Sequence, residues 1–370
     1  MKNKTNKLTR MGMLLALTTI TALCVATPVR AASHKPPHGG GAGSGLPYTT
    51  ASTLSQLIAD INYANSVGGA ITINLAPGAT FDLKSADNTT DGGNGLPVIG
   101  ATKAVALTII GNGATLNRIA VIDRYYNVKN PFRLFDVASG SSLTLDQVTL
   151  KGGWIASGGG ILNHGTVNII NGCTLSGNTV GIYNNGGTVT VRDSTFSGNS
   201  AGSGGAIYTV GGTVMVSDST LSGNLALYNG GGIYNVGGTV TVSSSTLSGN
   251  SARFGGGIYN SGGIVTMSNG SALSDNTAFH ADYPWSGGTG GGLYNDGGTV
   301  AINNSTVSGN IADANFGTGG GIYNTGGTVT VENRSSVTGN TADDVDNRSV
   351  LYLDGTSTIG ILDGNSAIPF

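Results

Sequence analysis

Side chains that could carry out acid–base or metal chemistry are few and scattered in this sequence. Only 10% of the 370 residues are charged, and the chain holds 19 acidic residues, 4 histidines and 2 cysteines. Cleavage of polysaccharides needs clustered carboxylates, and calcium needs several acidic oxygens around one point. The cluster of Asp343, Asp344 and Asp346 fits better as a solvated end that discourages strand pairing. We therefore expect no catalytic residue, no metal site and no cofactor.

The cysteine and histidine positions favour structural or solvent-exposed roles. Cys173 occupies the position that Ser194 and Ser219 fill in later repeats, so we expect a small packed residue and no internal disulfide. His164 replaces an Asn or Val at a turn, and we expect it to be exposed and without a role. His280 differs, because it lies in a long loop beside aromatic residues.

Aromatic side chains are the better candidates for binding, because they offer large apolar area at a low entropic cost. They gather in the segments between repeats, where the rest of the surface is mostly Thr, Ser, Asn and Gly. The candidate ligand-binding residues in these segments are Tyr228, Phe254, Phe279, His280, Asp282, Tyr283, Trp285 and Phe316. The alternative is that their rings fold back and seal the corner of the fold.

The candidate segments separate seven copies of an internal repeat that begins near residue 158. One block reads GGGIYN, as at residues 230–235, and a second reads GGTVTV and then STLSGN, as at residues 237–250. The distance from the Ile of the first block to the closing Asn is 17 or 18 residues, whereas the distance from that Asn to the next Ile or Leu varies from 4 to 17. Fixed segments indicate structure and variable segments indicate surface loops.

Each copy predicts three short strands joined by tight corners. Val240 and Val242 alternate with threonines, which is the pattern of a strand with one buried face, and Leu247 is the apolar residue of the last strand. Units this short bury their apolar faces only by stacking, so the sequence predicts an all-β, right-handed parallel β-helix solenoid. The closing asparagines (Asn178, Asn199, Asn224, Asn250, Asn276, Asn310 and Asn340) should form an amide ladder, and the tyrosines after each Ile should form an outer stack.

The segment before the regular repeats predicts a cap and irregular first rungs over residues 49–157. Thr53 and Gln56 can form a capping box for a helix over residues 53–65, which would cover the open edge of the first rung. Residues 71–75, 105–110 and 143–150 predict early strands. The unusual stretch 117–133 is interpreted as a packed lid in preference to a ligand site.

The N-terminus predicts export. Residues 1–31 combine a basic start, an apolar stretch and small residues before a cleavage point after Ala31, which is typical of a signal peptide. Residues 32–48 predict a flexible linker, residues 158–345 the regular repeats and residues 346–370 a degenerate last rung. Cleavage would leave 12 basic and 19 acidic residues, a formal charge of −7, which argues against a nucleic-acid partner. We expect no transmembrane segment in the mature chain.

Two short motifs give the repeat a family resemblance. Residues 204–207 read GGAI and residues 196–199 read FSGN, which fits the FxxN pattern. Together they resemble the repeat of the chlamydial polymorphic outer-membrane proteins, within the secreted bacterial parallel β-helix proteins. That family consists of autotransported adhesins with a β-barrel translocator after the repeats. The resemblance implies adhesion. Barrel-mediated anchoring is not expected to carry over to a sequence that ends at Phe370.

Three functions are compatible with these observations. The favoured one is a secreted or cell-surface, non-catalytic, adhesin-like protein that binds an extracellular glycan or the surface of a host or partner protein. Association with the outer membrane is the alternative location. The second hypothesis is a structural repeat protein of the cell envelope, and the third is a polysaccharide lyase or hydrolase. The enzyme hypothesis lacks a clustered acid constellation in the regular repeats.

Overall fold

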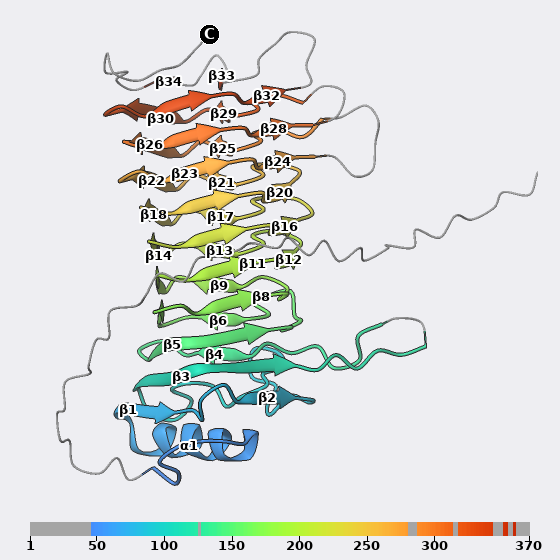
Figure 1. Cartoon of the computed structure of the whole chain (residues 1–370), viewed down its shortest axis with the longest axis vertical. Coiled ribbons are helices and arrows are strands. Elements are labelled where there is room, and N and C mark those ends of the chain that lie inside the picture. The colour runs from blue at the N-terminus through green and yellow to red at the C-terminus, as the bar shows by residue number, and fades with distance from the viewer. Residues whose placement is uncertain are drawn as a thin grey trace, which may run out of the picture. The chain divides into compact units, whose positions relative to one another are not determined.

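A computed structural model describes residues 46–124, 127–279, 287–313, 317–342, 351–353 and 358–359. Its strands form a right-handed parallel β-helix with one helix at the N-terminal end, as predicted (Figure 1). The predicted signal peptide, nearly all of the predicted linker and most of the predicted last rung lie outside the described residues.

A regular rung contains four strands, so the prediction of three was one short. In one rung these are β17 (Ile233–Val236), β18 (Thr239–Ser243), β19 (Thr246–Ser248) and β20 (Ser251–Ala252). The fourth strand has two residues, of which only the alanine is buried. A strand this short leaves no periodic pattern in a sequence, which is why it was missed.

The strands form three parallel sheets, which we name from their content. The tyrosine sheet contains β4 (Phe135–Val137), β6 (Ile161–Asn163), β9 (Ile182–Asn185), β13 (Ile207–Val210), β17, β21 (Ile258–Ser261), β25 (Leu293–Asp296), β29 (Ile322–Thr325) and β33 (Leu351–Leu353). The short sheet contains β12 (Ser200–Ala201), β16 (Leu225–Ala226), β20, β24 (Thr277–Ala278), β28 (Ile311–Ala312) and β32 (Thr341–Ala342).

The long sheet holds two strands of most rungs. Its first strands are β1 (Gly69–Asn74), β3 (Val105–Arg118), β5 (Ser142–Lys151), β7 (Thr166–Ile170), β10 (Thr188–Arg192), β14 (Thr213–Ser217), β18, β22 (Ile264–Ser268), β26 (Thr299–Asn303), β30 (Thr328–Glu332) and β34 (Thr358–Ile359). Its second strands are β2 (Thr80–Leu83), β8 (Thr174–Ser176), β11 (Thr195–Ser197), β15 (Thr220–Ser222), β19, β23 (Ala272–Ser274), β27 (Thr306–Ser308) and β31 (Ser336–Thr338).

Strand register places each residue type over its copy in the next rung. Ile233 pairs with Ile258, and Leu247 pairs with Leu273. The side chains of Val240, Val242 and Leu247 are fully buried, whereas Thr241 faces outward, as the alternation predicted. Each inward position therefore forms a buried column of apolar side chains along the solenoid, and these columns stabilise every pair of neighbouring rungs.

The closing asparagines form the predicted amide ladder inside the solenoid. The Asn224 amide nitrogen donates to Asn250 Oδ1 at 2.9 Å, and the Asn250 amide nitrogen donates to Asn276 Oδ1 at 2.9 Å. The backbone N–H of Asn224 also donates to Asn250 Oδ1, at 3.0 Å. The same pattern runs from Asn178 to Asn340, so each buried amide satisfies a backbone group as well as its neighbour.

A second amide ladder follows the tyrosine sheet and was not predicted. Asn235 donates to Asn260 at 2.8 Å, and Asn260 donates to Asn295 at 2.8 Å. The sequence signal was the last residue of each GIYN block, which the repeat analysis used only as a marker. Thr209 interrupts this ladder, because its hydroxyl accepts from Asn184 at 3.1 Å and donates to the Gly211 carbonyl at 2.6 Å.

The helix α1 (Leu54–Val67) caps the first rung, close to the predicted range of residues 53–65. Its capping box is the predicted one, with Thr53 accepting from the Gln56 backbone and Gln56 accepting from the Thr53 backbone. Leu57 and Ile61 are fully buried against the first strands. The cap therefore shields the apolar interior at this end of the solenoid.

The substitution Asn250→Ala should lower the free energy of unfolding by about 2–4 kcal/mol, because it removes ladder bonds and leaves the buried Asn224 N–H without an acceptor. Asn303→Ala is the matched control, since Asn303 is half-buried on the outer face of β26, and it should cost less than about 0.5 kcal/mol. Urea midpoints of the variants test this. Equal midpoints for the two variants would contradict it.

Candidate functional site

The connections between the short sheet and the tyrosine sheet leave the solenoid from one column of positions. Asn229, Phe254, Thr289 and Thr318 form successive parallel bridges between neighbouring rungs. The strands of the short sheet stand in a column beside them (Figure 1). We call the residues Leu227–Asn229, Arg253, Phe254, Phe279, Thr289 and Thr318 the loop edge.

Three of the eight predicted binding residues can be placed, and all three lie on the loop edge. The Tyr228 side chain is 57% exposed, whereas Phe254 and Phe279 are half-buried. The Phe254 N–H donates to the Tyr228 carbonyl at 2.8 Å, so these two residues lie on consecutive rungs. His280, Asp282, Tyr283, Trp285 and Phe316 lie outside the described residues.

Arg253 lies on the loop edge beside Phe254, although it is not one of the eight candidate binding residues. Its guanidinium carbon lies 4.9 Å from the centre of the Phe254 ring. Its Nε atom is buried without a hydrogen-bond partner. Within the described ranges, the Arg253 side chain makes neither a hydrogen bond nor an ion pair.

Glycines allow the loop edge to lie close to the tyrosine sheet. Gly255 follows Phe254 with φ +63°, a conformation that other residues rarely adopt. A Cβ atom on Gly256 would lie 2.5 Å from the Gly291 carbonyl oxygen of the next rung. The Gly-rich block of each repeat is therefore required for close stacking of the backbone at this corner.

A ladder of six tyrosines runs along the outer face of the tyrosine sheet, as predicted. Neighbouring ring centres are 4.7–5.2 Å apart, in both stacked and edge-to-face arrangements. The Phe254 ring contacts Tyr294 edge-to-face at 5.7 Å, which joins the loop edge to this ladder. The members of the ladder are Tyr183, Tyr208, Tyr234, Tyr259, Tyr294 and Tyr323.

The tyrosine ladder and Tyr228 offer different chemistry. Ladder rings cover one another, so their edges and hydroxyls remain for a ligand. Burial raises the pKa of Tyr208 to about 12 and also raises the pKa of Tyr259, so these hydroxyls stay protonated at neutral pH. The Tyr259 hydroxyl donates to Asp296 at 3.2 Å. Tyr228 has no ring neighbour among the described residues, so its flat face is accessible.

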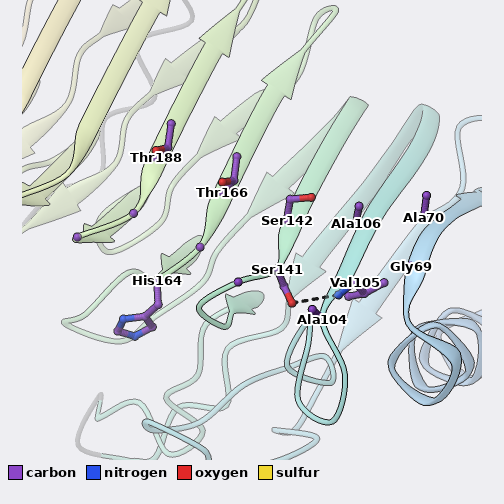
Figure 2. Close-up of a pocket in the computed structure, with 14 residues that line it drawn as sticks. Gly69, Ala70, Ala104, Val105, Ala106, Ser141, Ser142, His164, Thr166 and Thr188 are labelled. Carbon is purple, nitrogen blue, oxygen red and sulfur yellow. Dashed lines mark hydrogen bonds between the residues drawn. The ribbon is translucent and has the colours of Figure 1, made fainter.

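A shallow groove of about 620 Å³ runs across several rungs at the start of the long sheet (Figure 2). Its walls are small residues, and the Val105 N–H donates to Ser141 Oγ at 3.1 Å. His164 lies at the groove and is half-buried, so the prediction that it is exposed was wrong. The backbone N–H of His164 donates to the Val137 carbonyl at 2.9 Å, which fixes the main chain at this corner.

Asp136 lines a neighbouring cavity of about 410 Å³ together with Asp91 and His164. It is 1% exposed, and its carboxylate accepts from Arg133 at 3.4 Å. Arg133 is fully buried and also donates to Asn94 at 2.8 Å. This pair ties the segment around Asn94 to the solenoid, which agrees with a packed role for Arg133. Asp136 was missed, since a single buried acid leaves no sequence pattern.

The described residues contain neither a metal-ligand cluster nor a membrane-spanning helix. No group of three or more His, Cys, Asp and Glu side chains that could hold a metal ion occurs among them. Cys173 is buried, as predicted, and burial raises the pKa of its thiol to about 11. In this part of the chain no helix has the length and apolar character needed to cross a membrane.

Burial raises the pKa of Asp136 from 3.8 to about 6, although Arg133 opposes the shift. The folded protein therefore binds more protons than the unfolded chain in this interval, and this contribution to stability is lost as pH rises through about 6. The loss should be about 3 kcal/mol. In the Asp136→Asn variant, this contribution should be missing from the difference between the free energies of unfolding at pH 4 and pH 7, measured with urea. The exposed Asp218→Asn control should retain the wild-type difference. An unchanged difference in Asp136→Asn would contradict the assignment.

Comparison with known proteins supports the repeat assignment. Residues 193–210 and 218–236 match the model of the Chlamydia polymorphic membrane protein repeat. The first match spans β11 to β13 and the second spans β15 to β17, so both run from the long sheet to the tyrosine sheet. No curated protein and no solved structure matches the chain. The predicted resemblance is thus confirmed, and the chain carries repeats of a surface and outer-membrane type, the Chlamydia polymorphic membrane protein repeat.

Proposed function

We propose that this protein is a secreted or cell-surface, non-catalytic binding protein that is adhesin-like and uses the loop edge as its ligand surface. The observation that carries the proposal is the exposed Tyr228 beside Arg253 and Phe254, with Phe254 in contact with the tyrosine ladder. The surface-type repeat and the predicted signal peptide at residues 1–31 agree with this location.

The rigid setting of these side chains favours binding. Phe254 contacts both Arg253 and Tyr294, so its side chain loses little conformational entropy when a ligand binds. Aromatic anchors that are already positioned are typical of residues that dominate binding energy. The column of equivalent positions suits an extended ligand, either a glycan or a segment of a partner protein.

We propose that the other five predicted binding residues extend this surface. His280, Asp282, Tyr283 and Trp285 belong to the connection that follows Phe279 on the loop edge, and Phe316 belongs to the next one. Loops with aromatic tips on a rigid scaffold are a common arrangement for binding. These five residues are therefore proposed to continue the contact area on two further rungs.

The two alternative functions, a structural envelope protein and a polysaccharide-cleaving enzyme, predict different experimental results. A structural envelope protein would show no ligand that depends on Tyr228. A polysaccharide-cleaving enzyme would release product, and the cavity with Asp91, Asp136 and His164 is where its acids would lie. The burial of Asp136 and its contact with Arg133 favour a structural role for that carboxylate. Incubation with polysaccharides, with and without calcium, and with Asp136→Asn as control, separates these cases.

Tyr228→Ala should weaken binding of the mature chain to its glycan-array or pull-down ligand by about tenfold or more, because it removes an exposed aromatic anchor. Tyr48→Ala is the matched control, since Tyr48 is 39% exposed near the N-terminal cap helix, away from the loop edge, and it should bind normally. Identical affinities of the two variants, together with an unaffected Tyr283→Ala/Trp285→Ala double variant, would exclude the loop edge.

The fluorescence of Trp285 provides a second measurement. Trp154 is 49% exposed and would contribute to the signal, so the measurement is made in a Trp154→Phe background. Iodide should quench the remaining emission of Trp285, and bound ligand should protect it. Emission that iodide does not quench would mean that the ring is sealed into the corner and that this part of the surface is not a site.

A further inference from the structure

We propose that the ligand of the loop edge is an anionic glycan, and that Arg253 binds its carboxylate or sulfate group. This inference rests on the proposed function of the loop edge and narrows it to one chemical class. It starts from a cation without a counter-ion, next to an exposed aromatic ring on the adjacent rung.

The first observation is the electrostatic state of Arg253. The repeat region from residue 158 to residue 342 contains three arginines and no lysine, and Arg253 is the one on the loop edge. Arg192 has a carboxylate neighbour, Asp193, at 3.5 Å, whereas Arg253 has no ion pair within the described ranges. Its buried Nε donor also lacks an acceptor. Its two terminal nitrogens also make no hydrogen bond within the described ranges, and they are not buried, so these are the donors that an external acceptor can reach.

The second observation is the position of the guanidinium. It lies over the Phe254 ring at 4.9 Å, and Phe254 is fixed in turn by Tyr294 at 5.7 Å. The contact with the Phe254 ring therefore positions the guanidinium, while its terminal N–H donors remain for a ligand. A planar fork of donors matches the two oxygens of a carboxylate or sulfate, and Arg forms such paired bonds better than Lys.

Three described acidic residues of the repeats, Asp193, Asp218 and Asp313, lie away from Arg253. Asp193 and Asp218 lie at the corner between the two strands of the long sheet, which is a different corner from the loop edge. Asp313 occupies the same column as Arg253 but two rungs further on, about 10 Å away by strand spacing. Screening in physiological salt acts over about 8 Å, so the acidic character of the whole chain does not prevent local binding of an anion.

Tyr228 favours a glycan over an acidic peptide. Its exposed flat ring lies one rung from Arg253, a separation of about 4.8 Å along the solenoid, so one sugar unit can contact both. The apolar face of a sugar ring packs on an aromatic ring, while its acidic group points to the guanidinium. A peptide rich in Glu would use the arginine alone, so the aromatic contact distinguishes the two ligands.

The test uses the mature chain and four probes: polygalacturonate, its carboxyl-reduced neutral form, dextran sulfate and poly-glutamate. The wild type should bind polygalacturonate or dextran sulfate at least about tenfold more tightly than the reduced polymer, and added salt should weaken binding. Arg253→Gln should lose this preference and Arg253→Lys should retain part of it. Arg192→Gln, the matched control, should behave as wild type. The ratio of carboxylate to sulfate binding identifies the acidic group.

Each opposing result has a separate meaning. Equal, Tyr228-dependent binding of the charged and reduced polymers would overturn the role of Arg253 and leave the proposed function standing. Binding of neither acidic polymer would overturn the anionic-glycan assignment, while the wider panel with Tyr228→Ala decides the proposed function. Poly-glutamate binding as tight as that of the glycans would overturn the choice of ligand class. Carboxyl reduction changes only the probe, so the test does not depend on the folding of Arg253→Gln.

Discussion

The structure depends on one constraint: a buried amide must find a partner, and here the partner is the same amide one rung away. Each closing asparagine bonds both the side chain and the backbone of its neighbour, so a rung that slipped by one residue would leave several buried groups unpaired. Register fixed in this way places Ile over Ile, Val over Val and Tyr over Tyr. The apolar core and the tyrosine ladder are consequences of that alignment.

The same alignment separates stability from binding. Rungs are held by residues that recur, so the connections at the loop edge vary in length without disturbing the core. Side chains that occur once, such as Tyr228 and Arg253, are found at this edge. A solenoid of this kind presents unusual residues at a regular spacing on a rigid support, which agrees with the surface-protein origin of the matching repeat.

What the sequence could predict was set by periodicity. Seven copies of the repeat made the parallel β-helix, the buried valines and the closing amide ladder predictable, and the local Thr53–Gln56 pattern identified the helix cap. Contacts that do not recur from repeat to repeat could not be predicted from the sequence. They include the Phe254–Tyr294 contact, the burial of Asp136 beside Arg133 and the half-buried position of His164. These depend on how one particular loop meets the wall. The signal peptide and the binding role of all eight candidate residues remain predictions.

Thr209 has a mechanical consequence. Its single hydroxyl proton goes to the Gly211 carbonyl, so the amide ladder of the tyrosine sheet stops between β13 and β17, whereas the closing-asparagine ladder continues past this point. Under tension along the axis, the load at this junction is carried by the closing-asparagine ladder and the backbone bonds of the sheets. Among the rungs from β6 to β29, this junction therefore has one amide-ladder bond fewer than its neighbours, and an axial load would be shared by fewer side-chain bonds there.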